Sequence, residues 1–198
     1  MYTSLNDLTT AGVAMLSSTV LPPATTRRWF NSVSHTSDIL GSVGAPREIV
    51  RDISSDPNGR VVNWYTKEGD IGTYAAKLHL SPDYNAGFGI LAAQDEGMPQ
   101  VSLIADAVAQ AFLPALEVAA RTQATAAYVG TYSSPDTSLN SSLSLASDGL
   151  PGLLITAWDS NGTDQLLTLA QPNKLPTVSP RIYLPNVGNA TNVVFCIV

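Results

Sequence analysis

The pattern of apolar and polar positions predicts a three-stranded antiparallel meander in the middle of the chain. The strands are expected at residues 60–67, 73–80 and 87–93, with glycine and Pro-Asp turns between them. One face of the second strand is apolar and consists of Tyr74, Ala76, Leu78 and Leu80. Its other face is mixed and consists of Thr73, Ala75, Lys77 and His79. The third strand is apolar throughout, which is typical of a strand covered on both faces.

Helical patterns lie on both sides of this meander. Ser4 with Asp7 resembles a capping box and begins a helix with Leu5, Leu8, Gly12, Met15 and Leu16 on one face. The pair Pro22-Pro23 begins a second, shorter helix. The longest apolar stripe follows the meander and consists of Ile104, Ala107, Val108, Ala111, Phe112, Ala115, Leu116 and Ala119. We expect Pro114 to kink this helix or to split it in two.

Residues 35–46 are expected to form a loop, residues 47–53 a strand and residues 56–59 a tight turn. From residue 123 the chain becomes rich in Ser, Thr, Asn and Gly. Short strands are predicted there at residues 127–132, 142–146, 153–158, 165–169, 181–184 and 193–197. We therefore predict two domains, residues 1–122 and residues 123–198. The expected fold class is α/β of the α+β type, with an antiparallel meander and packed helices followed by a small β-rich domain.

Composition limits the possible functions. The 198 residues are 44% hydrophobic and 13% charged, which suits a chain that buries a core. The formal charge of −6, with ten scattered basic residues, argues against a nucleic-acid binder. Cys196 is the single cysteine, so the chain has no internal disulfide and no cysteine-based metal site. Its place in an apolar run predicts a buried strand thiol rather than a reactive one.

No segment is expected to be apolar for long enough to span a bilayer. The longest candidate, residues 103–120, is interrupted by Asp106, Pro114 and Glu117. A signal peptide is not visible, because the first residues are polar and lack a basic region. Three Asn-x-Ser/Thr sequons, at Asn140, Asn161 and Asn189, hint at a secreted parent protein. The location of the chain itself therefore stays open.

The meander carries a resemblance to a known family. In order and spacing, residues 65–93 resemble the meander of the serine β-lactamase, penicillin-binding protein and esterase superfamily. The resemblance implies that Lys67-Glu68-Gly69 stands where that family has a Lys/His-Ser/Thr-Gly triad, which forms one wall of the active site. Residues 2–8, 25–29 and 42–46 resemble fungal β-lactamase-like proteins in particular. Residues 128–164 are similar to the small β-rich C-terminal domain of the same fungal proteins.

The family's nucleophile is missing from this sequence. The resemblance implies an amino-terminal region with a Ser-x-x-Lys motif, in which a nearby base activates the serine hydroxyl. The three lysines are Lys67, Lys77 and Lys174, and none has a serine three residues before it. Two Ser-x-Asn matches, at Ser4 and Ser138, are interpreted as coincidence. The catalytic residues are therefore unknown from this sequence.

The resemblance places the substrate-binding candidates at Lys67, Glu68, Gly69 and Tyr74. Lys67 would steer anions, and the main chain just past Gly69 would donate to an oxyanion. Glu68 replaces the usual hydroxyl with a negative charge, which would repel an anionic substrate. The competing interpretation is that Lys67 and Glu68 are solvated charges at a strand end. No cofactor and no metal site are expected, since the two histidines, His35 and His79, are distant in sequence. We expect His79 to be at the surface or half-buried, and His35 to bond locally to Asp38.

Two functional hypotheses follow. The first is a β-lactamase-related serine hydrolase or esterase that is truncated, with Met1 an internal methionine, or that depends on a separate amino-terminal part. Its sheet would have an unpaired edge beside the last meander strand, which predicts a homodimer or a partner chain. The second is a non-hydrolytic pseudoenzyme, binding protein or repurposed cyclase or isomerase, for example of secondary metabolism. A deep apolar pocket with a buried Glu68 would favour it. Both bind a small molecule, an ester or amide in the first case, and neither involves a membrane.

Overall fold

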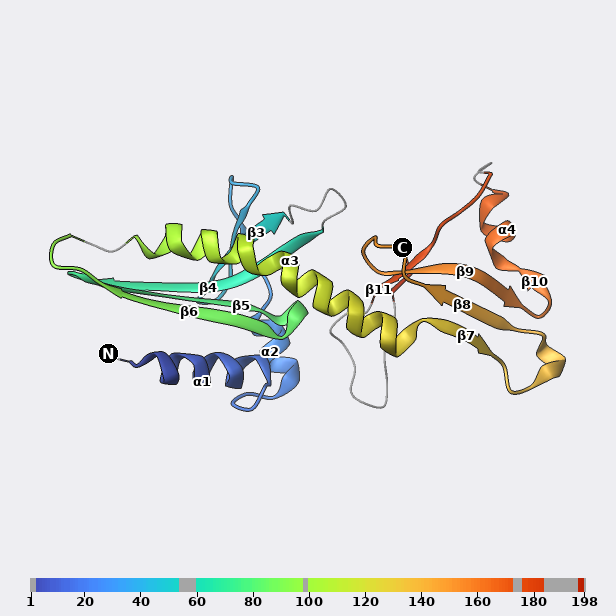
Figure 1. Cartoon of the computed structure of the whole chain (residues 1–198), viewed down its shortest axis with the longest axis horizontal. Helices are drawn as coiled ribbons and strands as arrows, with labels where there is room; N and C mark the ends of the chain where they lie inside the picture. Colours follow the sequence, from blue (N-terminus) through green and yellow to red (C-terminus); the bar gives the residue numbers. More distant parts are fainter. Residues whose placement is uncertain (1–2, 54–59, 98–99, 173–175, 184–195, 198) are drawn as a thin grey trace. The chain divides into compact units, whose positions relative to one another are not determined.

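The computed structural model describes residues 3–53, 60–97, 100–172, 176–183 and 196–197. The chain divides into two compact units, residues 1–116 and residues 117–198, each with its own antiparallel sheet (Figure 1). The division falls inside one long helix, and the predicted boundary between residues 122 and 123 lies in that same helix. The described residues form two antiparallel sheets and four α-helices, which confirms the α+β class.

The sheet of the first unit has its strands in sequence order, each antiparallel to the next. They are β1 (Ser34–His35), β2 (Gly41–Val43), β3 (Glu48–Ile53), β4 (Val61–Ile71), β5 (Tyr74–Ser81) and β6 (Ala86–Ala93). The predicted meander is confirmed as β4, β5 and β6, with a short 3-10 turn, Pro82–Tyr84, before β6. β4 continues past the predicted end to Ile71, which pairs with Tyr74 across a two-residue turn. Gly72 in that turn has φ +60°, a conformation that glycine adopts without steric cost.

The expected loop at residues 35–46 contains β2 and the end of β1, so that prediction is wrong. Strands of two or three residues are too short to show an alternating pattern in the sequence. In the structure β1 pairs with β2, and β2 pairs with β3. The strand predicted at residues 47–53 is confirmed as β3. The turn predicted at residues 56–59 lies outside the described residues.

Helices α1 (Leu5–Leu16) and α2 (Pro23–Trp29) form as predicted. The Asp7 amide donates to the Ser4 hydroxyl at 3.2 Å, and the Asp7 carboxylate accepts in return, which completes the capping box. α1 packs closely on β5 and β6 because glycines face it. A Cβ on Gly89 would lie 2.9 Å from Leu8 Cδ2. The buried cluster here contains Phe30, Leu78 and Leu80, with Leu8, Met15, Leu16 and Tyr65 packed around it.

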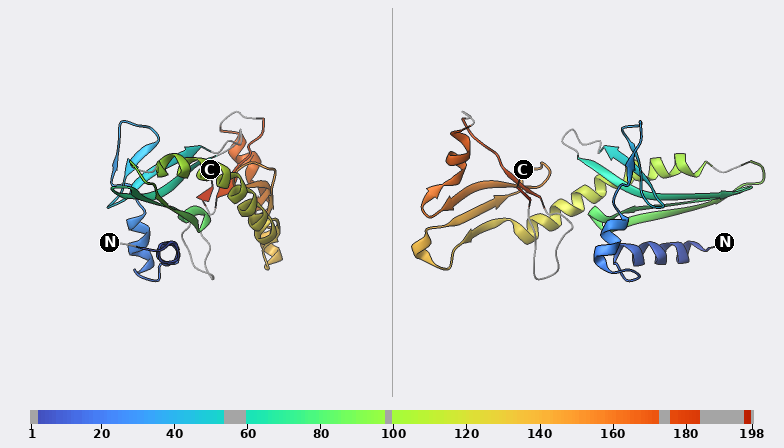
Figure 2. Two further views of the ribbon diagram at one scale, coloured as in Figure 1. Left: turned by 60° about the vertical axis from the view of Figure 1, so that its left-hand side comes forward. Right: turned by 180° about the vertical axis from the view of Figure 1, so that it is seen from behind.

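Helix α3 (Val101–Tyr128) lies on the opposite face of this sheet from α1 (Figure 2). Its buried residues are Val101, Ala105, Ala109 and Leu113, spaced four apart. The predicted stripe is wrong, because Ile104 and Val108 are exposed. α3 is apolar around most of its circumference, so periodicity alone does not select the buried face. Pro114 does not split the helix.

Because α3 is apolar on most sides, the expectation that no segment is apolar for long enough to span a bilayer is wrong. α3 is long and apolar enough to cross a membrane by length and composition, with a mean hydropathy of 1.5 over 18 residues. Asp106 and Glu117 are too few charges to break that window. Length and composition are weak indications by themselves, since helices of soluble proteins also meet them.

The second unit is a sheet in the order β12-β11-β9-β8-β7, with β10 paired to β9. Its elements are β7 (Gly130–Ser133), a 3-10 turn (Thr137–Leu139), β8 (Ser142–Ala146), β9 (Leu153–Ser160), β10 (Thr163–Asp164), α4 (Gln165–Ala170), β11 (Arg181–Tyr183) and β12 (Cys196–Ile197). The buried core consists of Leu145, Leu153, Ile155 and Ile182. Residues 127 and 128 complete α3, so β7 begins later than predicted.

The strand predicted at residues 165–169 is wrong, because this segment is helix α4. Asp164 caps the helix, and its Oδ1 accepts hydrogen bonds from the amides of Leu166 and Leu167. The strands predicted at residues 142–146, 153–158 and 181–184 are confirmed as β8, β9 and β11. The side chain of Cys196, predicted to be buried, lies outside what the structure describes, as does the sequon at Asn189.

Candidate functional site

The second half of β4 carries Lys67, Glu68 and Gly69. Alternation along the strand places Lys67 and Gly69 on the sheet face that α1 covers further along, and Glu68 on the face that α3 covers. Tyr74 pairs with Ile71, so it shares the face of Lys67 and Gly69. The structure therefore brings three of the four expected site residues to one face and turns the fourth to the other.

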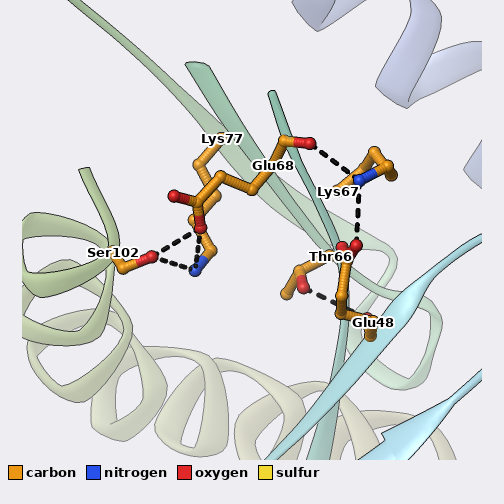
Figure 3. Close-up of polar contacts among 6 residues, drawn as sticks. All are labelled: Glu48, Thr66, Lys67, Glu68, Lys77 and Ser102. Carbon is orange, nitrogen blue, oxygen red and sulfur yellow. Dashed lines mark hydrogen bonds and ion pairs between the residues drawn. The ribbon is translucent and has the colours of Figure 1, made fainter. Parts of the chain in front are cut away.

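Glu68 lies in a polar cluster with Lys77 and Ser102 (Figure 3). Its Oε2 is 3.0 Å from Lys77 Nζ and accepts a hydrogen bond of 2.5 Å from the Ser102 hydroxyl. Lys77 Nζ also donates to Ser102 Oγ at 2.7 Å. The Lys77 side chain is only 10% exposed, whereas that of Glu68 is 39% exposed. The hydrogen bond from Ser102, followed by the interactions with Lys77, holds the pKa of Glu68 below its usual value.

This cluster changes the expected effect of Glu68. Its charge is balanced by Lys77 and does not stand beside the Lys67 ammonium (Figure 3). Because Ser102 belongs to the first turn of α3, the cluster ties β4 and β5 to the start of that helix. The contacts made by Glu68 are thus those of a residue that holds the sheet and the helix together. A direct role in binding substrate stays a prediction.

Lys67 has different surroundings. Its ammonium donates to Glu48 Oε1 at 2.8 Å and to the Glu68 carbonyl oxygen at 2.7 Å. The Lys67 and Glu48 side chains are 52% and 51% exposed. An ion pair this exposed contributes only about 0–1 kcal/mol. The ammonium can therefore exchange Glu48 for an anion on a ligand at little cost.

Gly69 and Tyr74 border open space. A Cβ added to Gly69 would meet no atom within 4 Å, so packing in this structure does not require a glycine there. Tyr74 is 60% exposed, and Ile71 beside it is also exposed. This end of the meander face is accessible, as the wall of a binding site needs to be.

A small cavity of about 70 Å³ lies elsewhere on the same face, between α1 and the strands β5 and β6. Its lining includes Gly12, Val13, Leu80 and Gly87, and it contains none of the predicted site residues. Ligand pockets usually measure about 300–1,000 Å³. This cavity is therefore too small to be a substrate pocket.

His79 is a core residue, so the expectation that it is at the surface or half-buried is wrong. It is 1% exposed, stacks on Phe88 with ring centroids 4.7 Å apart, and lies 6.0 Å from the Trp64 ring. Burial, with a smaller contribution from the positive charge of Lys77, lowers the pKa of His79 to about 4. The imidazole is consequently neutral at physiological pH.

His35 is exposed, and its Nδ1 lies 3.0 Å from Arg51 Nη2. The expected bond to Asp38 does not form, because the Asp38 carboxylate instead accepts from the Leu40 amide. Among the residues that the structure describes, no three His, Cys, Asp or Glu side chains gather as a metal site would need.

Sequence reasoning missed the partnership of Glu68 with Lys77 and Ser102. One signal was present, since a two-residue hairpin turn at Gly72-Thr73 places Ile71 opposite Tyr74 and hence Glu68 opposite Lys77. The third partner, Ser102, lies in the first turn of α3, after the segment that follows the meander. Only the packing of α3 on the sheet brings it close, so no local pattern in the sequence predicts it.

The comparisons with known proteins agree with the meander and with the β-rich second unit. Residues 120–196 match the family model described as Beta-lactamase-like-like, C-terminal domain. The chain is also 34% identical over 136 residues to a β-lactamase-like protein of Arthroderma benhamiae. That match covers 68% of this chain and 23% of the fungal protein, so the chain corresponds to about a quarter of its relative's length. No solved structure matches the chain. The chain is therefore a relative of the fungal β-lactamase-like proteins, with the C-terminal domain of that family at residues 120–196.

Proposed function

We propose that this chain supplies the meander wall of a β-lactamase-like serine hydrolase, and that a serine on another polypeptide segment supplies the nucleophile. The observation that carries the proposal is the half-exposed Lys67 ammonium in the second half of β4, beside the open space at Gly69. A cation beside open space on the face of a strand suits an acyl substrate whose oxygen becomes negative during the reaction. The substrate class is a small ester or amide.

A nucleophile within the chain is a poorer account of the site. Ser102 Oγ lies 2.7 Å from Lys77 Nζ. This distance would suit a serine nucleophile with a lysine as its base. However, the Ser102 hydroxyl donates to Glu68, and Lys77 is the cationic partner of the same carboxylate. A lysine in that role has no free lone pair with which to take the serine proton. We therefore assign these three residues to the support of the sheet.

We propose that the segment with the nucleophilic serine attaches at the free edge of β6. β6 ends the strand order of the sheet, so its outer edge is unpaired among the described residues. Unpaired strand edges readily accept another strand. We propose that a segment of the same protein or of a partner chain pairs there and carries the nucleophile towards Lys67.

The test uses the protein purified from its natural source, together with its Lys67→Met and Glu48→Gln variants, assayed with a fluorogenic ester and a chromogenic β-lactam. Loss of one donor that stabilises the oxyanion typically costs about 10²–10³-fold in kcat. We expect Lys67→Met to lower kcat/KM to that extent. Glu48→Gln removes the partner of Lys67 but keeps the ammonium, so it should stay within a few-fold of the parent. Full activity in Lys67→Met would refute the proposal.

One observation favours the alternative of a non-hydrolytic binding protein or repurposed enzyme. The position that resembles the family's hydroxyl-bearing residue holds Glu68, and its side chain is bound to Lys77 and Ser102. A scaffold that lacks both this hydroxyl and a nucleophile can still bind a ligand. In the same assays such a protein would turn over neither substrate, while a non-reactive ester analogue would still bind and Lys67→Met would weaken that binding.

A further inference from the structure

Arg47 is almost completely buried, although no carboxylate in the described part of the chain contacts it. It directly precedes β3 and is 4% exposed. Its guanidinium carbon lies 4.0 Å from the centre of the Trp29 ring and 5.0 Å from that of Phe30. Nη2 contacts the Met15 sulfur at 3.0 Å, and Nε has no hydrogen-bond partner. Aromatic rings and a thioether therefore take the place that acidic side chains usually take around a buried arginine.

This arrangement leaves the hydrogen-bonding capacity of Arg47 largely unused. A guanidinium has five N–H donors in a planar fork, and a thioether sulfur is a weak acceptor. The neighbouring acid, Glu48, bonds to Lys67 instead. Burial lowers the pKa of Arg47, and no nearby acid opposes that effect. Buried charges are normally paired, because an unpaired one loses its hydration without compensation.

The surroundings of Arg47 favour an anion. Helix α2, which supplies Trp29, also carries Arg27 and Arg28 in its last turn and contains no acidic residue. Both of these arginines are exposed. Trp29 and Phe30 lie against the guanidinium, and its Nε–H has no acceptor among the residues that the structure describes. A carboxylate fits that edge with two parallel hydrogen bonds.

We propose that Arg47, held by Trp29, Phe30 and Met15, is a binding site for an organic carboxylate with an apolar body. The carboxylate is either part of a free small molecule or the acidic side chain of another polypeptide. The aromatic bracket fixes the orientation of the fork, and the apolar lining selects a carboxylate with a hydrocarbon part over a small inorganic anion. This proposal is independent of the hydrolase proposed above.

The test follows the Arg47 Nε–H resonance of the 198-residue protein, labelled with ¹⁵N-arginine, during a titration with sodium benzoate at constant ionic strength. Benzamide is the matched neutral probe. We expect a saturable shift of the Arg47 signal with benzoate and none with benzamide. In calorimetry, Arg47→Met should lose benzoate binding and Arg47→Lys should weaken it at least tenfold, whereas Arg121→Met, which removes a positive charge from the second unit, should leave it unchanged.

Dilution distinguishes the two sources of the carboxylate. If a second copy of the chain supplies it, the Arg47 signal changes with protein concentration before any benzoate is added, and benzoate lowers the association. If a small molecule supplies it, dilution has no effect and only benzoate shifts the signal. The proposal is wrong if benzoate produces no saturable shift, if benzamide shifts the signal equally, or if folded Arg47→Met binds benzoate like the parent.

Discussion

At the scale of single residues, three ionisable side chains make contacts inside the fold that the sequence does not indicate. Glu68, expected at an active-site wall, joins Lys77 and Ser102 under α3. His79, expected to be at the surface or half-buried, packs in the core against Trp64 and Phe88. Arg47 lies among Trp29, Phe30 and Met15. In each case at least one partner comes from another part of the chain, namely Ser102 for Glu68, Trp64 for His79 and Met15 for Arg47. Alternation along one strand cannot predict such partners.

The Glu68 cluster predicts a stability loss. Glu68→Gln leaves Lys77, whose side chain is 10% exposed, without its carboxylate. We expect the free energy of unfolding at pH 7, measured with urea, to fall by about 1–2 kcal/mol, less than for a fully buried pair because Glu68 is partly exposed. The control Glu48→Gln removes a half-exposed pair and should cost less than about 0.5 kcal/mol. Equal losses in the two variants would contradict this account.

His79 predicts a pH dependence. Its pKa is about 4 in the folded chain and about 6.5 in an unfolded one, so the unfolded state binds the proton first as the pH falls. Stability should therefore decrease from pH 7 towards pH 4, by up to about 3 kcal/mol from this residue, and the decrease should level off below pH 4. His79→Phe should make the urea midpoint less dependent on pH in that range.

The control for His79 is His35→Gln, which changes the exposed histidine. It should keep the pH dependence of the parent protein. If His79→Phe and the parent protein lose stability in parallel between pH 7 and pH 4, the assignment of His79 as a neutral core residue is wrong.

At the scale of elements, local signals predicted well wherever one residue type fixes the backbone. The capping box at Ser4 begins α1, Pro23 begins α2, and Gly72 sets the turn between β4 and β5. Predictions failed where the sequence fits two structures. α3 is apolar on more than one face, and its small residues Ala105 and Ala109 proved to face the sheet. The segment after Asp164 is apolar enough for a strand, but the Asp164 cap makes it a helix.

The close packing of β6 against β5 predicts which glycines are essential. A Cβ on Gly87 would lie 2.5 Å from the His79 carbonyl oxygen and 2.7 Å from Leu80 Cδ2. Because backbone cannot move aside, Gly87→Ala should destabilise the chain by about 2–3 kcal/mol in urea unfolding. Gly69→Ala meets no atom and should change stability by less than about 0.5 kcal/mol. Similar losses at the two positions would contradict the packing described for β6.

At the scale of the whole molecule, the chain consists of two units with separate cores. The first core contains Phe30, Leu78 and Leu80, and the second contains Leu145, Leu153, Ile155 and Ile182. From the change in composition near residue 123 the sequence predicts two domains, residues 1–122 and 123–198, and those bounds stay a prediction. It did not predict that one helix, α3, takes part in both units, because no break in helical pattern marks the boundary.

Separate cores predict separate responses to mutation. Arg181 makes two hydrogen bonds to the Asp148 carboxylate, of 2.9 and 2.6 Å, and donates to the Pro151 carbonyl oxygen. Arg181→Met should destabilise the second unit by about 2–3 kcal/mol because these polar groups lose their partner. Hydrogen exchange followed by mass spectrometry should show faster exchange in β8 and β9, with β4 and β5 unchanged. Faster exchange in both sheets would show that the units unfold together.

The central claim is that this chain is the meander part of a hydrolase whose nucleophile lies elsewhere. The most direct measurement is to treat the native protein from its source with a serine-reactive fluorophosphonate and to identify the labelled serine by mass spectrometry. The account predicts a labelled serine outside residues 1–198, in a protein or complex that contains this chain and hydrolyses the ester substrate. A folded native protein of these 198 residues alone, inert and unlabelled, would contradict the claim, as would a label on a serine within them.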